Sequence, residues 1–88
     1  MSRQRSIEAI SASVSVSIGE LVRLTNCRYS TLKFYTEEGM LPFEQAEENL
    51  TRRYHREETV LRIRLIQELK AQGLSIPQIK ERLRTSST

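Results

Sequence analysis

The chain has little of several residue types on which small proteins often depend. Its 88 residues include one cysteine, one histidine, two prolines, three glycines and no tryptophan. A single cysteine excludes an internal disulfide, and with one histidine it cannot complete a four-ligand zinc site. No apolar run approaches the roughly 20 residues that a membrane-spanning helix needs, and the N-terminus lacks a secretory signal. We therefore expect one small cytoplasmic domain without a metal.

The sequence also offers no catalytic group with a partner. Cys27 lies in an apolar turn, and His55 follows a run of arginines with no acid fixed beside it. Neither residue has the arrangement that activates a nucleophile. A chain of 88 residues is also too short for a deep substrate site together with a cofactor fold. We therefore expect that the protein is not an enzyme, has no catalytic residues and binds no cofactor.

Positive charge is concentrated in the second half of the chain. The sequence has 14 lysines and arginines against 11 acidic residues, which gives a net charge of +3. Residues 49–88 hold nine basic and four acidic side chains, and thus a charge of +5. Five arginines lie in a thirteen-residue stretch: Arg52, Arg53, Arg56, Arg62 and Arg64. This clustering suits a surface that faces phosphates, and a solvated helix face is the alternative.

Local signals predict two helices joined by a short turn. Ser17 and Glu20 form a capping box that opens a helix of about two turns, with Ile18, Leu21, Val22 and Thr25 on one side. A second helix over residues 29–38 is ended by Gly39. The connection has only three or four residues, so the two helices are forced to cross steeply.

Two further helices are expected after residue 56. The first spans about residues 57–72 and ends before Gly73, and Ser75 opens the second. Leu61, Leu65 and Leu69 form one ridge of the first helix, while Ile63 and Ile66 lie on another. This pattern predicts a helix that is buried on two sides.

The remaining segments are polar or irregular. Residues 1–16 are serine-rich without a helical stripe, which predicts a disordered tail that ends in one short strand at most. Residues 39–53 suit a loop or small hairpin, and residues 85–88 suit a disordered end. We therefore expect one folded domain over residues 17–84.

The helix over residues 29–38 has an unusual exposed side. Helical projection places Tyr29, Leu32, Tyr35 and Thr36 on one face, and Ser30, Thr31, Lys33, Phe34 and Glu37 on the other. A helix in the major groove needs small polar groups, a cation and an apolar contact for thymine methyls. Its acidic residues come at the far end, away from the part that reads bases. The alternative is that Phe34 belongs to the core and this register is wrong.

The motifs occur in a recognisable order: Ile18–Leu21, Leu32–Tyr35, Gly39–Pro42, Arg52–Tyr54, then Gly73–Ile76 and Ile79. This combination, over residues 17–83, resembles the N-terminal DNA-binding domain of the MerR family of transcription regulators. The resemblance implies a mainly α fold, a winged helix-turn-helix with four helices and a small β-hairpin wing.

The resemblance also implies a site. Lys33 and Tyr35, together with Arg52, Arg53 and Tyr54, would contact DNA bases or backbone. Strand alternation sends the two adjacent arginines to opposite sides, so they should not share one task. The alternative for Tyr35 and Tyr54 is a half-buried position in the core instead of a contact with DNA. The full expected DNA-binding set is Arg28, Tyr29, Ser30, Thr31, Lys33, Phe34, Tyr35, Arg52, Arg53 and Tyr54.

The chain departs from the family pattern in three places. Arg28 replaces the small capping residue that is common before the second helix. This helix therefore either lacks a side-chain cap or uses Asn26, and Arg28 is free to bind phosphate. The wing has Glu44, Glu47 and Glu48 where the family has arginine and glycine, so contacts by the wing tip are in doubt. The sequence stops near the place where the family's long dimerisation helix begins. We therefore expect no effector sensor here, and a homodimer or RNA polymerase contact only for a longer parent.

The leading expectation is sequence-specific binding of double-stranded DNA in transcription regulation, by a cytoplasmic, nucleoid-associated protein of bacterial type. One alternative is an architectural, excisionase-like factor that bends DNA. A second is a protein-interaction module that docks a partner on Phe34. A steep loss of DNA binding with salt argues against the last of these.

Overall fold

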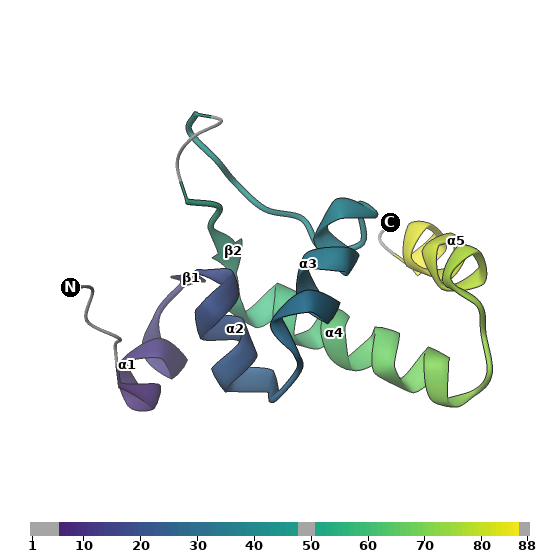
Figure 1. Cartoon of the computed structure of the whole chain (residues 1–88), viewed down its shortest axis with the longest axis horizontal. Coiled ribbons are helices and arrows are strands. Elements are labelled where there is room, and N and C mark those ends of the chain that lie inside the picture. Colours follow the sequence, from purple (N-terminus) through teal and green to yellow (C-terminus); the bar gives the residue numbers. More distant parts are fainter. Residues whose placement is uncertain (1–5, 48–50, 87–88) are drawn as a thin grey trace.

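The computed structural model describes residues 6–47 and 51–86. These residues form five helices and one antiparallel two-stranded sheet, which confirms a mainly α fold (Figure 1). Along the chain the elements are α1 (Ile7–Ala12), β1 (Ser15–Val16), α2 (Ile18–Thr25), α3 (Tyr29–Glu37), β2 (Tyr54–His55), α4 (Arg56–Ala71) and α5 (Ile76–Ser86). In this described part of the chain, no helix is both long and apolar enough to cross a membrane.

The N-terminal segment packs against the domain, which corrects the expected disordered tail. Residues 7–12 form α1, and its Ile10 is fully buried in the core. The expected strand follows as β1, in which Val16 pairs antiparallel with Tyr54 of β2. One buried isoleucine in a short serine-rich helix produces no periodic pattern, so the sequence did not reveal this contact. Residues 1–5 of the expected tail lie outside the described residues.

Helices α2 and α3 have the predicted start and end signals. The backbone N–H of Ser17 donates to Glu20 Oε1 at 2.9 Å, and the N–H of Glu20 donates to Ser17 Oγ at 3.3 Å. Asn26 ends α2 in the left-handed conformation, with φ of 59°. Gly39 follows α3 with φ of 76°, a conformation that glycine adopts without a steric cost. The capping box and the glycine stop are therefore confirmed.

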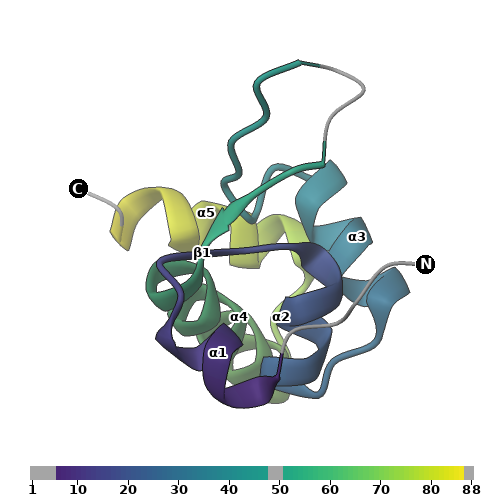
Figure 2. The same cartoon turned by 90° about the vertical axis from the view of Figure 1, so that its left-hand side faces the viewer.

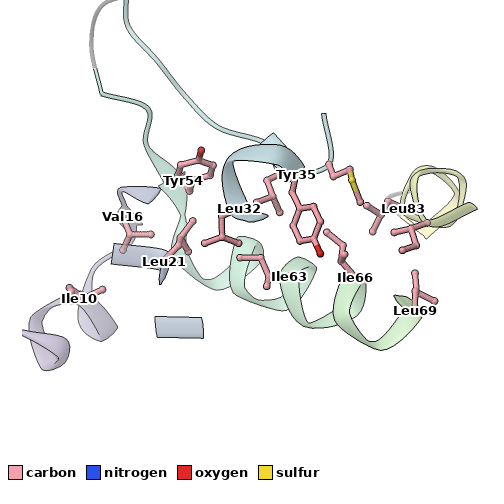
Figure 3. Packing of buried hydrophobic residues seen from close by; sticks show 13 residues of the cluster. Ile10, Val16, Leu21, Leu32, Tyr35, Tyr54, Ile63, Ile66, Leu69 and Leu83 are labelled. Atoms are coloured by element: carbon pink, nitrogen blue, oxygen red, sulfur yellow. The ribbon is translucent and has the colours of Figure 1, made fainter. Parts of the chain in front are cut away.

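Helix α4 is buried along one stripe rather than on two sides. Thr59, Ile63, Ile66 and Leu69 face the core, at spacings of three or four residues. Leu61 is 66% exposed, so the predicted leucine ridge is wrong at this position. The reason is that α2 and α5 pack against α4 from the side of this stripe, and Figure 3 shows Ile63 and Ile66 beneath α3 and Leu69 near Leu83 of α5.

Helix α5 begins as predicted and runs further than predicted. Gly73 has φ of 92°, and Ser75 and Gln78 exchange backbone-to-side-chain hydrogen bonds of 2.8 and 3.4 Å. The helix continues to Ser86, so the expectation of a disordered end over residues 85–88 is wrong for its first two residues. The Thr85 hydroxyl bonds the Arg82 carbonyl, which lets a polar residue remain helical. Residues 87–88 lie outside the described residues.

The core is one cluster to which every helix contributes. Figure 3 shows its side chains gathered above α4. Thirteen buried hydrophobic residues form it: Ile10, Val16, Leu21, Leu32, Tyr35, Met40, Leu41, Tyr54, Ile63, Ile66, Leu69, Ile79 and Leu83. The same cluster thus fixes α3 and β2, the two elements that position the candidate site.

Residues 42–47 and 51–53, called the wing below, project from the helical body (Figure 2). At its base Glu44 and Arg53 exchange two backbone hydrogen bonds, of 2.7 and 2.8 Å. Within the described residues, this antiparallel bridge joins the two arms of the wing. Its return arm continues into β2, which pairs with β1.

Candidate nucleic-acid interface

Helix α3 is divided between a buried face and an exposed one. Leu32, Tyr35 and Thr36 are buried against the core. Phe34 is 44% exposed, and Lys33 next to it is also exposed. The expected register therefore holds from Leu32 to Glu37, and the alternative that Phe34 is a core residue is excluded.

Other predicted residues at the start of α3 are also accessible. Ser30 is exposed, and Thr31 is half-buried. Tyr29 is 54% exposed, so it does not share the burial of Leu32 that the projection had suggested. The accessible part of α3 thus extends around its first turn.

The N-terminus of α3 is left open for an anion. Its N-cap residue, Arg28, is exposed and makes no capping hydrogen bond through its side chain. The Arg28 carbonyl accepts from the backbone N–H groups of Thr31 and Leu32, each at 3.1 Å. A helix N-terminus carries a partial positive charge, and here the N-cap residue is itself a cationic arginine with an exposed side chain. Both features favour a phosphate at this end.

Arg52 joins the wing to α3. Its guanidinium carbon lies 4.6 Å from the centre of the Phe43 ring, and its Nη1 lies 3.7 Å from Glu37 Oε1. A hollow of about 410 Å³, called the wing hollow below, separates α3 from the wing. It is lined by Ile18, Tyr29, Lys33, Glu37, Gln45, Thr51, Arg52 and Tyr54. A wing arginine and a helix lysine therefore share one concave surface.

Arg53 faces the other way. Its Nη2 donates to the carbonyl and to the hydroxyl of Ser15, both at 3.2 Å. This confirms that the two adjacent arginines point to opposite sides of the strand. Arg53 ties the wing to β1, so its guanidinium has a partner within the domain. We propose that Arg53 supports the wing through Ser15, and its expected contact with DNA stays a prediction.

Tyr54 is a core residue. It is 1% exposed, and its hydroxyl lies 2.9 Å from Thr36 Oγ1. The Thr36 hydroxyl hydrogen is used toward the Leu32 carbonyl at 2.9 Å, so the Tyr54 hydroxyl donates to Thr36. A side chain buried in this way cannot reach DNA, which corrects its expected contact role.

Tyr35 is also buried, at 3% exposure. Figure 3 shows its ring pointing from α3 toward α4. Burial raises the pKa of Tyr35, and the neighbouring Cys27 side chain raises the same pKa further. The neutral phenol is therefore favoured, and Tyr35 supports α3 rather than touching DNA. Its expected contact role is corrected in the same way.

A second hollow lies on the other side of α3, against the turn between α4 and α5. It measures about 420 Å³ and is called the turn hollow below. Its lining residues are Ser30, Thr31, Phe34, Tyr35, Lys70, Leu74, Ser75 and Ile76. Sequence reasoning missed Lys70 here, because a lysine in the last turn of a helix is common and carries little signal. Helix α3 is thus a ridge between two hollows, each with a cation from another element.

Comparison with curated proteins and with solved structures finds no match. The sequence model of one family, described as MerR HTH family regulatory protein, matches residues 16–86. This match begins in β1 and covers α2, α3, the wing, β2, α4 and α5, so it includes both sides of the α3 ridge. The chain therefore belongs to the MerR HTH family of DNA-binding transcription regulators.

Proposed function

We propose that the protein recognises a specific double-stranded DNA sequence by placing α3 in the major groove, and that it regulates transcription at the nucleoid. The observation that carries this proposal is the exposed pair Lys33 and Phe34, on the face of α3 that lies opposite its buried residues. The exposed Phe34 ring and the neighbouring Lys33 do not contribute to the core. The major groove accommodates a helix that presents an apolar ring and a cation.

Base reading is assigned to the middle of the exposed face. Lys33 suits the O6 and N7 acceptors of guanine, and Phe34 suits a thymine methyl. Ser30 and Thr31, one turn earlier, add hydroxyl groups that bond to several bases. These contacts choose the sequence, because each presents a pattern of donors, acceptors or apolar surface that matches some bases better than others.

Phosphate contact is assigned to the three cations around this face. Arg28 flanks the open N-terminus of α3, Arg52 flanks the wing hollow, and Lys70 flanks the turn hollow. Contacts to phosphate fix the register of a protein on the duplex without reading its sequence. Arg53 is outside this group because its side chain lies on the side of the strand away from the wing hollow, where its Nη2 bonds Ser15.

The first test selects a binding site from random duplexes and then measures Lys33→Ala on the selected and on random DNA. We expect a loss of about 1–3 kcal/mol in binding to the selected site and a smaller loss on random DNA. Arg64→Ala is the matched control, since Arg64 is an exposed cation on the opposite side of α4 from its buried stripe. Equal losses on both DNAs would reduce Lys33 to a phosphate contact.

The second test compares Arg52→Ala with Arg53→Ala. We expect the first to weaken binding to all sequences and to lower the slope of log affinity against log salt by about one. The second should keep the slope and lower the free energy of unfolding, because the hydrogen bonds to Ser15 are lost. If neither variant changes the salt slope, the wing does not contact the phosphate backbone.

The turn hollow supports a second candidate function, the docking of a protein partner. Phe34 is exposed there, beside the half-buried side chains of Leu74 and Ile76. The salt dependence of binding distinguishes DNA binding from the docking of a protein partner. Binding through phosphates weakens steeply as salt rises, whereas docking of an apolar ring does not.

A further inference from the structure

We propose that Glu37 sets the DNA affinity of the protein through Arg52. In the free protein the Arg52 guanidinium contacts the Glu37 carboxylate and the Phe43 ring, and a DNA phosphate must compete with both contacts. This inference rests on the proposed contact between Arg52 and phosphate. It adds a residue that sequence analysis had placed away from the DNA.

Three segments meet at this arginine. Glu37 ends α3, Phe43 lies on the outgoing arm of the wing, and Arg52 lies on the return arm. The ring centre is 4.6 Å from the guanidinium carbon, and the carboxylate oxygen is 3.7 Å from Nη1. The cation therefore has an aromatic face on one side and a negative charge on another, both of which attract it.

The pair is accessible to DNA. The exposed fractions of the two side chains are 35% for Arg52 and 53% for Glu37, and both line the wing hollow. An arginine binds phosphate best through two parallel hydrogen bonds from its planar fork. Turning that fork to a phosphate removes it from the carboxylate, and the carboxylate then repels the incoming negative charge. Glu37 thus weakens the binding of DNA whatever its base sequence.

The size of this opposition is bounded. Exposed ion pairs of this kind correspond to about a twofold to fivefold change in an equilibrium constant. Removing the Glu37 charge should therefore tighten DNA binding by roughly that factor. Lys33 lies one helical turn before Glu37 and lines the same hollow, so part of any gain could arise through Lys33. A double-mutant cycle separates the two routes.

The experiment measures binding of two unrelated duplexes by fluorescence anisotropy for the parent chain, Glu37→Gln, Arg52→Ala and the double variant. We expect Glu37→Gln to bind both duplexes about two to five times more tightly. In the Arg52→Ala background the same substitution should give a smaller gain. Glu47→Gln is the control, since Glu47 is an exposed wing carboxylate outside the residues that line the wing hollow. Its effect should be the same with and without Arg52.

Two results would overturn the proposal. One is a Glu37→Gln gain of equal size in both backgrounds, which would assign the effect to general repulsion or to Lys33. The other is the absence of any gain. Arg52→Lys repeats the cycle with the charge kept, in case Arg52→Ala disturbs the wing.

A second measurement does not depend on DNA affinity. Protons beside an aromatic face are shifted upfield in NMR spectra, so the Arg52 side chain of the free protein should show such shifts from Phe43. We expect these shifts to shrink in Glu37→Gln and to vanish when DNA is added to the parent chain. Unchanged shifts in Glu37→Gln would contradict the proposal. If no duplex binds at all, the proposed function fails, while the shifts of the free protein still decide whether Glu37 holds Arg52.

Discussion

The two helices of the helix-turn-helix differ in how much of their surface the domain uses. In α2 a capping box closes the N-terminus, and the N–H of Asn26 bonds the Val22 carbonyl at the other end. In α3 the side chain of Arg28 caps nothing, and one whole face remains exposed. Helix α2 thus serves the fold, whereas α3 serves the fold with one face and leaves the other exposed for the proposed contact with DNA. Stability and DNA binding should therefore depend on different residues, which mutation can separate.

The largest expected effect comes from the buried face of α3. Leu32→Ala should lower the free energy of unfolding by about 2–5 kcal/mol, because Leu32 is fully buried and its removal leaves a cavity. Phe34→Ala, on the exposed face, should cost less than about 1 kcal/mol. Urea denaturation of both variants measures this difference. Similar losses would mean that the two faces are not separate.

The next effect concerns the N-terminus of α2. Ser17→Ala removes one half of the capping box and should cost about 1 kcal/mol of unfolding free energy. The affinity for DNA, measured well below the melting temperature, should stay unchanged. A variant that folds normally and yet binds DNA poorly would show that α2 also contacts the ligand.

At the N-terminus of α3 we expect a substitution to raise stability and to weaken DNA binding. Arg28→Ser supplies the missing cap and should stabilise the domain by about 0.5–1 kcal/mol. The same variant should bind all DNA sequences more weakly and lower the salt slope by about one, since a phosphate contact is lost. Arg64→Ser is the control for the loss of a charge elsewhere. Tighter DNA binding by Arg28→Ser would show that the open N-terminus of α3 is not a phosphate site.

The smallest effect is a dependence on alkaline pH. The pKa of Tyr35 is raised in the folded chain, so the folded state holds the phenol proton more tightly than the unfolded state does. The stability from this group is complete below the unfolded pKa of about 10 and is lost as pH rises through the folded value. Unfolding free energies measured from neutral to alkaline pH should show a weaker fall in Tyr35→Phe.

Local signals in the sequence predicted local structure well. The capping box at Ser17 and the glycine after α3 act within a few residues, so no other segment can override them easily. Strand alternation likewise predicted that Arg52 and Arg53 diverge. Which of them faces the wing hollow depends on the pairing of β1 with β2, and that pairing involves residues far apart in the chain.

The errors arose where distant segments meet. Ile10 is buried by helices that follow it, so its own neighbours give no sign of burial. Tyr35 and Tyr54 entered the expected DNA-binding set through the family resemblance, and their residue type alone does not tell a core tyrosine from a contact tyrosine. Glu37 ends α3 as expected, but a helical projection does not include the return arm of the wing, so its contact with Arg52 was not predicted.

The pairing of β1 with β2 also has a mechanical consequence. The segment after α1 is fastened at successive points, because Arg56 bonds the Ser13 carbonyl at 2.6 Å and Arg53 bonds Ser15. These two arginines belong to the strand and helix start that carry the wing. A load applied to α1, for example by a bulky partner fused before residue 6, would therefore be transmitted along β1 to the base of the wing. The N-terminal segment is therefore mechanically coupled to the wing, the part for which we propose a contact with phosphate.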